Sequence, residues 1–154
     1  MELILWRHAD AVDSLPDSER PLSDKGLKQA ERMADFLRSR LPQHTRILVS
    51  PAKRAQQTAL ALTKHFITEP AIAPNCSAQA LLKAANWPRA EGSVLIVGHQ
   101  PVLGAVAAKL LCTSASSLSV KKGAAWWLSS DNNEDDERAT LRLLISPDFL
   151  RQKG

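Results

Sequence analysis

The chain has 154 residues, of which 44% are hydrophobic and 23% charged, a size and composition typical of one globular domain, which we expect to span residues 1–154. No apolar stretch is long enough to cross a membrane and no secretion signal is visible, so we expect a cytoplasmic protein without a membrane partner. The net charge of +4 is scattered along the chain and aromatic residues make up only 5%, which argues against a nucleic-acid partner and favours a positive pocket for an anionic substrate.

The first predicted element is a short apolar run at residues 2–6, whose length suits a strand buried on both faces better than a helix. The run stops at Arg7 and His8, so two side chains with strong hydrogen-bonding capacity lie where a buried strand surfaces. Ligands of open α/β sheets bind just beyond the carboxyl ends of the strands. Taken alone, however, Arg7 and His8 are better explained by a strand that ends in solvent than by a ligand site.

A polar loop at residues 9–22 follows, and a loop of this length in a compact domain is often functional. Ser23 has the properties of a helix N-cap, and Pro42 is expected to stop the helix that follows. The buried face of this helix is predicted from apolar residues at helical spacing, which are Leu27, Ala30, Ala34, Leu37 and Leu41.

A second strand is predicted at residues 46–49, followed by a helix at residues 52–65. Arg54 lies in the first turn of this helix, where free backbone N–H groups also favour an anion. Ile67 and Ile72 suggest a short third strand, although Pro70 interrupts it. The next predicted elements are a short helix at 78–86, a strand at 94–97 and a helix at 102–111.

The C-terminal part predicts two strands, at residues 124–129 and 139–146, joined by an acidic tip at 130–138 that contains no apolar residue. If the first of them is a strand, Trp126 and Trp127 point to opposite faces of the sheet. Alternating strands and helices followed by a hairpin predict an α/β fold, a three-layer α/β/α sandwich with a mixed, mostly parallel sheet.

Three of these buried strands deliver a histidine or an arginine at or just past the carboxyl end. If the strands are parallel neighbours, Arg7, His8, Arg54 and His99 converge on one rim. The segments Arg7-His8-Ala9, Ser50-Pro51-x-x-Arg54-Ala55-x-Gln57-Thr58 and Gly98-His99 resemble the histidine phosphatase superfamily, which includes the phosphoglycerate mutases. The segment Arg20-Pro21-Leu22-Ser23 and the short chain are most similar to its SixA-type phosphohistidine phosphatase subgroup.

The resemblance implies a phosphoglycerate mutase-like fold and a phosphatase without a cofactor. It also implies that a phosphohistidine forms on His8 and that water then hydrolyses it. Phosphoryl transfer needs an in-line nucleophile and positive charge around the phosphoryl oxygens, which Arg7, Arg54 and a protonated His99 would supply. His8 can attack if one ring nitrogen is unprotonated and the other is fixed by a backbone acceptor.

Other chemistries fit the sequence less well. A metal site at His8 and His99 is disfavoured because the two arginines repel a cation, and Cys76 and Cys112 lack metal-ligand spacing. Ser50 is not expected to be a serine nucleophile, because the Gly-x-Ser-x-Gly turn is absent. Arg20 and Ser50, which lie in the quoted segments, are kept as candidate substrate-binding residues.

One departure from the family pattern concerns the general acid. Members that act on phosphate esters commonly carry a Glu or Asp in the segment after the third strand, but residues 70–90 contain neither. The first motif also differs, because Ala9 follows Arg7-His8 where members of the family more usually have glycine. Asp17, in the first loop, is a candidate proton donor, set against its interpretation as an ordinary solvated carboxylate. The missing acid favours a phosphoramidate such as phosphohistidine, whose leaving nitrogen is protonated more readily than an alkoxide.

The leading hypothesis is therefore a protein phosphohistidine phosphatase, whose partner is a protein with a phosphorylated histidine, such as a phosphotransfer domain. A small-molecule phosphomonoesterase of the same fold is the second hypothesis. The third is a catalytically silent module that binds phosphate. A silent module has no need of a nucleophile, so the complete set of Arg7, His8, Arg54 and His99 argues against it. A monomer is favoured.

Overall fold

The computed structural model describes residues 1–111, 113–130 and 138–151. Its centre is a six-stranded sheet with the strand order β3-β2-β4-β1-β5-β6. The strands are β1 (Glu2–Arg7), β2 (Arg46–Val49), β3 (Ile67–Thr68), β4 (Ser93–Gly98), β5 (Ala125–Ser130) and β6 (Ala139–Ile145). The first four strands are parallel, whereas β5 is antiparallel to both of its neighbours. The mixed, mostly parallel sheet with a C-terminal hairpin is therefore confirmed.

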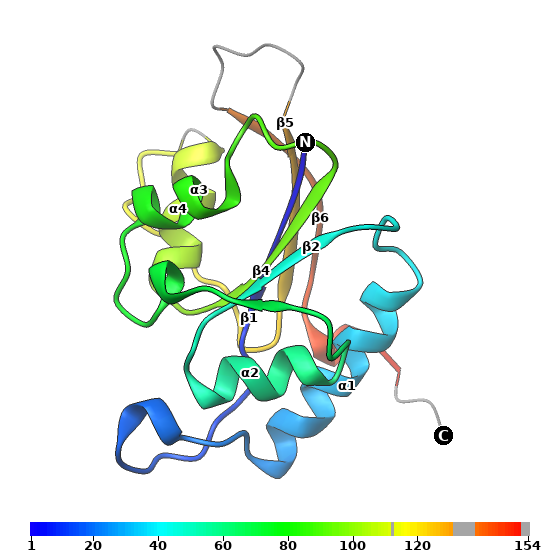
Figure 1. The fold of residues 1–154 in the computed structure, drawn as a ribbon, viewed down its shortest axis with the longest axis vertical. Helices are drawn as coiled ribbons and strands as arrows, with labels where there is room; N and C mark the ends of the chain where they lie inside the picture. The colour runs from blue at the N-terminus through cyan, green and yellow to red at the C-terminus, as the bar shows by residue number, and fades with distance from the viewer. Residues whose placement is uncertain (112, 131–137, 152–154) are drawn as a thin grey trace.

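Helices cover both faces of the sheet, as Figure 1 shows. One face carries α1 (Asp24–Arg38) and α2 (Lys53–Leu60), and the other carries α3 (Ala78–Ala85) and α4 (Val102–Leu110). Three short 3-10 helices complete the secondary structure of the described residues: η1 (Asp17–Glu19), η2 (Pro70–Ile72) and η3 (Pro147–Phe149). The predicted three-layer α/β/α sandwich is confirmed, and no helix within these residues is long and apolar enough to cross a membrane.

Two hydrophobic cores follow from the alternation of side chains along the central strands. In β1, Leu3 and Leu5 face the core beneath α3 and α4, whereas Ile4 and Trp6 face the core beneath α1 and α2. All four side chains are fully buried, which is why this strand reads as a continuous apolar run. Trp126 and Trp127 of β5 likewise join opposite cores, as predicted.

Helix α1 begins at the predicted cap, since the Ser23 hydroxyl accepts a hydrogen bond from the Gly26 N–H at 3.0 Å. The inclusion of Leu27 in its buried face was wrong, because Leu27 is 49% exposed. Gly26 is buried instead, and a Cβ there would lie 1.9 Å from the Asp10 carbonyl oxygen. The helix therefore packs its first turn directly against the backbone of the first loop, a contact that apolar periodicity does not reveal.

The second predicted helix is shorter than expected, ending at Leu60 rather than at residue 65. Beyond Leu60 the chain turns back, because β3 must pair with the outer edge of β2. Ile67 lies in β3, but Ile72 is buried in η2 and does not extend the strand, which stops just before Pro70. Most of the predicted hairpin tip, residues 131–137, lies outside the described residues.

The sheet order determines where the site forms. Because β4 lies between β1 and β2 and all three are parallel, their carboxyl ends meet at one edge of the sheet. His8 follows β1 and His99 follows β4, while α2 begins just after β2 and carries Arg54 in its first turn. The residues predicted to converge are therefore delivered to the same rim.

Candidate active site

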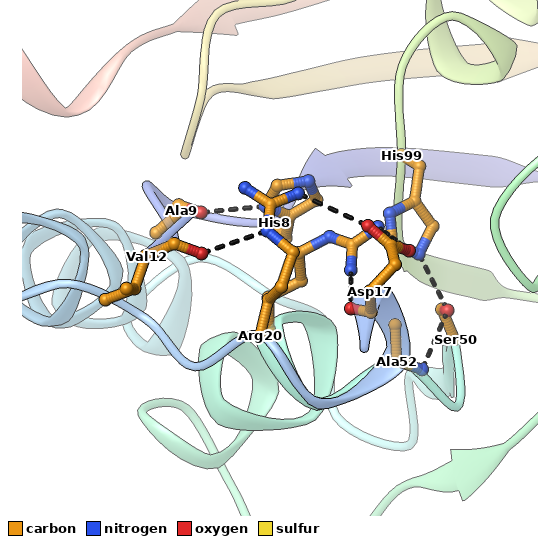
Figure 2. A network of polar contacts seen from close by, with 9 residues as sticks. His8, Ala9, Val12, Asp17, Arg20, Ser50, Ala52 and His99 are labelled. Atoms are coloured by element: carbon orange, nitrogen blue, oxygen red, sulfur yellow. Dashed lines mark hydrogen bonds and ion pairs between the residues drawn. The ribbon is translucent and has the colours of Figure 1, made fainter. Parts of the chain in front are cut away.

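A cavity of about 320 Å³ opens at this rim. The structure brings six of the seven candidate residues to its lining: Arg7, His8, Asp17, Arg20, Arg54 and His99. The seventh, Ser50, is fully buried and does not line the cavity. Ser50 instead contacts the site through His99, because the Ser50 Oγ lies 2.7 Å from the His99 Nε2 (Figure 2).

His8 has its tautomer fixed by the backbone. Its Nδ1 lies 2.7 Å from the carbonyl oxygen of Ala9, which can only accept, so Nδ1 carries the proton and donates (Figure 2). The other ring nitrogen, Nε2, then holds an unprotonated lone pair. Burial lowers the pKa of His8 to about 4, and the nearby Arg54 and Arg7 contribute in the same direction. At neutral pH, His8 is therefore an uncharged base with one free lone pair.

The tautomer of His99 follows from the hydrogen-bonding capacity of Ser50. The Ser50 Oγ accepts a hydrogen bond from the Ala52 N–H at 3.2 Å, and its own proton has no other acceptor among the described residues than His99 Nε2. The hydroxyl therefore donates to Nε2, which places the ring proton of a neutral His99 on Nδ1. This Nδ1 is buried without a hydrogen-bond partner in the described chain. His99 can thus donate to an anion without first being protonated.

The two imidazoles lie close together, with ring centroids 5.1 Å apart and a tilt of 54°. Burial, together with the proximity of His8 and Arg54, lowers the pKa of His99 to about 3. The positive charge of the site therefore comes from the two arginines. The two imidazole rings are neutral and do not repel each other electrostatically. A bound dianion would raise both pKa values, because it favours the charged forms.

Arg7 and Arg54 are each held by a backbone carbonyl. The Arg7 Nη1 donates to the Val120 oxygen at 2.7 Å, and the Arg54 Nη1 donates to the Asp17 oxygen at 2.9 Å. The Nε atoms of both arginines are buried and have no hydrogen-bond partner within residues 1–111, 113–130 and 138–151. Positioned guanidinium groups with unused donors are suited to the oxygens of a phosphoryl group.

Asp17 is paired with two arginines, Arg54 of α2 and Arg20 of the first loop. Its carboxylate lies 3.3 Å from Arg54 Nη2 and 3.4 Å from Arg20 Nη1, and Arg20 also donates to the Val12 carbonyl (Figure 2). Desolvation of the carboxyl group opposes ionisation, but Arg54 and Arg20 outweigh it and hold the pKa of Asp17 below its ordinary value. An ionised carboxylate has no proton to give, so this pairing counts against Asp17 as a proton donor in the free protein.

Five further lining residues were not among the predicted site residues: Ala11, Pro74, Asn75, Gln100 and Lys122. Pro74 and Asn75 belong to the stretch after β3, which contains no Asp or Glu between residues 70 and 90. Gln100 bridges α4 and the following loop, donating to the Leu118 oxygen and accepting from the Gly104 N–H. Lys122 reaches the rim from a loop distant in sequence, and only the folded chain shows its proximity.

The pKa values of the two histidines predict acid sensitivity. Their ordinary pKa is 6.5, but folding lowers it to about 4 for His8 and about 3 for His99, so below pH 6.5 the unfolded chain binds more protons than the folded one. The free energy of unfolding should therefore fall as the pH decreases from 6.5 to 5, by up to about 1.4 kcal/mol per pH unit for each histidine.

Urea unfolding in buffers without phosphate measures this slope, and the interval above pH 5 avoids most carboxyl titration. A double variant, His8→Gln with His99→Gln, is the control and should show a distinctly flatter profile. Equal slopes in the two proteins would mean that folding does not lower the pKa values of these histidines.

Two neutral histidines and two fixed arginines around a cavity at the carboxyl edge of a parallel sheet define a phosphatase with a histidine nucleophile. The profile of the histidine phosphatase superfamily (branch 1) matches residues 3–75. The chain is 33% identical to the phosphohistidine phosphatase SixA of Escherichia coli (strain K12) over 120 residues, covering 71% of this chain and 74% of the relative. The chain belongs to the histidine phosphatase superfamily.

Other relatives agree with this assignment. A SixA homologue of Haemophilus influenzae is 33% identical over 126 residues, which cover 71% of this chain and 77% of the relative. The solved structure of a protein histidine phosphatase SixA in complex with tungstate superimposes with a TM-score of 0.79 at 26% identity, covering 98% of this chain and 100% of that chain. The resemblance seen in the sequence is thereby confirmed.

Proposed function

We propose that the protein removes the phosphoryl group from a phosphorylated histidine of a partner protein, with His8 as the nucleophile. The bare Nε2 of His8 attacks phosphorus and the P–N bond of the substrate breaks, its electron pair going to the partner's ring nitrogen. The partner's ring leaves as a neutral imidazole, because its second nitrogen already carries a proton. Water then attacks the phosphohistidine on His8, releasing inorganic phosphate and restoring the lone pair. Arg7, Arg54 and the Nδ1–H of His99 donate to the phosphoryl oxygens in both steps.

The observation that carries this proposal is that the cavity has no protonated carboxyl group to act as an acid. Among the described residues, Asp17 is the only carboxylate in the lining, and its two arginine partners favour the ionised form. On the side where an ester-cleaving enzyme of the family would carry an acid, the lining residues are Pro74 and Asn75. A site without a ready proton donor suits a leaving group that needs little help, and the imidazole of phosphohistidine is one.

Asp17 and Arg20 have another role in this proposal. The Asp17 carboxylate and its backbone carbonyl both accept from Arg54, so they fix the direction of that guanidinium. Arg20 lines the cavity and shares the Asp17 carboxylate, which makes it a contact for the outer part of the substrate. The proposed partner is a phosphotransfer protein, and the names of the SixA relatives support phosphohistidine as the substrate.

Substrate ranking tests the proposal. We expect kcat/KM to be much higher for phosphohistidine peptides and aryl phosphates than for alkyl phosphates. A positioned acid accelerates the reaction by about 10²–10⁴-fold, and an alkoxide leaving group depends on it most. The measurement is kcat/KM for one substrate of each kind, with the His8→Ala protein subtracting spontaneous hydrolysis.

Asn75→Asp supplies the matched gain of function. Asn75 lines the cavity with a positive φ of 69°, which aspartate tolerates, so this variant introduces a carboxyl group with little change in shape. It should raise alkyl phosphate turnover more than aryl phosphate turnover. If the wild-type protein already hydrolyses alkyl and aryl phosphates equally well, the small-molecule phosphatase hypothesis replaces this proposal.

A further inference from the structure

A second cavity, of about 390 Å³, lies beside the first one and is distinctly basic. It runs between the outer face of α1 and the loop before β5, and we call it the basic groove. Its lining includes five basic residues and one acidic residue, and the basic ones are Lys25, Lys28, Arg32, Lys121 and Lys122. Lys122 lines both cavities, so the basic groove continues directly from the site that holds His8.

The basic side chains come from one helix stripe and one loop. Lys25, Lys28 and Arg32 are spaced by three and four residues, which places them on the same side of α1. Lys25 and Lys28 are exposed. Lys121 and Lys122 each pair with one carboxylate, Asp148 at 3.4 Å and Asp10 at 2.8 Å, so the positive charge that these two lysines leave uncompensated is small. The surplus therefore resides mainly on the exposed Lys25 and Lys28 of α1.

The loop wall of the basic groove is tied to the catalytic strand. Its Gly123 N–H donates to the His8 carbonyl at 3.2 Å, and the Trp6 indole donates to the Gly123 carbonyl at 3.1 Å. Gly123 has a φ of 76°, and a Cβ there would lie 2.8 Å from Pro147, so glycine lets this loop pack closely against η3. The basic groove is thus a fixed extension of the active site.

The opposite side of the catalytic cavity has a different character. The cavity that shares Asn75 and Gln100 with it is lined by uncharged residues, among them Cys76, Val102 and Ala105. A protein whose phosphohistidine enters the catalytic cavity must cover the surface around it. The surface of that protein therefore meets positive charge on the α1 side and no charge on the α4 side.

We propose that the basic groove docks an acidic surface of the phosphohistidine-bearing protein, next to the phosphorylated histidine. This inference rests on the proposed function and specifies the chemistry of the partner. The positive charge on α1 should raise the rate of encounter and lower KM for acidic substrates, and salt should weaken both effects. It should not affect small substrates, because Lys25 and Lys28 do not line the catalytic cavity.

The test compares synthetic peptides of equal length, one with Asp and Glu around the phosphorylated residue and one with Asn and Gln. Both are prepared with phosphohistidine and, separately, with phosphotyrosine. The wild-type protein should prefer the acidic peptide of each pair by about tenfold in kcat/KM, and raised salt should remove that preference. The double variant Lys25→Glu with Lys28→Glu should abolish the preference at low salt while hydrolysis of a small aryl phosphate is unchanged.

Lys83→Glu is the matched control, because Lys83 is exposed on α3, which covers the opposite face of the sheet. A wild-type protein without preference for acidic peptides, or equal effects of the Lys83 and α1 variants, would overturn the docking proposal. If RNA or phosphatidylserine vesicles inhibit hydrolysis of the acidic phosphopeptide more strongly than the unphosphorylated acidic peptide does, the basic groove does not bind a protein surface and the proposal fails. If aryl phosphates are hydrolysed but neither phosphohistidine peptide is, the proposed function fails, and the phosphotyrosine pair alone then decides the role of the basic groove.

Discussion

Replacing His8 with alanine should abolish turnover while the protein stays folded. We expect kcat to fall by on the order of 10⁶, the scale of loss when a hydrolase loses its nucleophile. The fold should survive because His8 lies beyond the last residue of β1 and belongs to neither large hydrophobic core. Its removal also frees the Ala9 carbonyl, which lies near the cavity where water can satisfy it.

The decisive measurement is the covalent intermediate. Mixing the wild-type protein with ³²P-labelled substrate and quenching without acid should leave label on the protein, because the phosphohistidine on His8 forms before water attacks. His8→Ala should carry no label. His99→Ala should still become labelled, but more slowly, since it loses a donor and keeps the nucleophile. Retention of label by His8→Ala would show that another residue is the nucleophile.

A control variant separates these effects from the loss of any histidine. His65 is exposed near the end of the segment after α2 and does not line the cavity, so His65→Ala should leave both labelling and turnover unchanged. Circular dichroism and a thermal melt of each variant confirm folding. The comparison therefore attributes any loss to the chemistry of the particular imidazole.

The residues of the site were predictable where they follow buried strands. An apolar run that stops at a histidine shows where a buried strand ends. Because parallel strands share one carboxyl edge, the run also indicates that the histidine lies at that edge. Arg54 was predictable for a similar reason, since a helix that starts after a strand presents its first turn at that edge. The order of the strands, which decides whether these ends are neighbours, does not follow from periodicity, so the convergence was predicted only on the condition that the strands are parallel neighbours.

The remaining features depend on contacts between distant segments. Gly26 replaces Leu27 on the buried side of α1 because the Asp10 backbone lies against the helix, and nothing local in the sequence indicates that approach. Lys122 reaches the cavity because β5 pairs with β1 and brings the preceding loop to the catalytic strand. The ion pair between Asp17 and Arg54 likewise joins two segments far apart, and by holding the pKa of Asp17 below its ordinary value it counts against the predicted role of proton donor.

Arg54→Ala is expected to have the largest effect after loss of His8. Arg54 is only 5% exposed, two of its donors are held by Asp17, and its Nε is unused in the described chain, so it is positioned before the substrate arrives. Removing one such donor from developing charge costs about 2.7–4 kcal/mol, which lowers kcat by about 10²–10³-fold. Arg54→Lys should lose nearly as much, because an ammonium cannot reproduce the planar guanidinium.

A second readout distinguishes this role from a general loss of structure. Arg54 lowers the pKa values of both His8 and His99, although burial is the larger cause for each. NMR titration of the ring nitrogens should therefore show both pKa values rising in Arg54→Ala and rising less in Arg54→Lys, which keeps the charge. Asp17→Asn should reduce kcat by less than Arg54→Ala, because the Asp17 backbone carbonyl still accepts from Nη1. Activity of Arg54→Lys within about threefold of wild type would mean that charge alone suffices at this position. The fixed guanidinium geometry would then have no catalytic consequence.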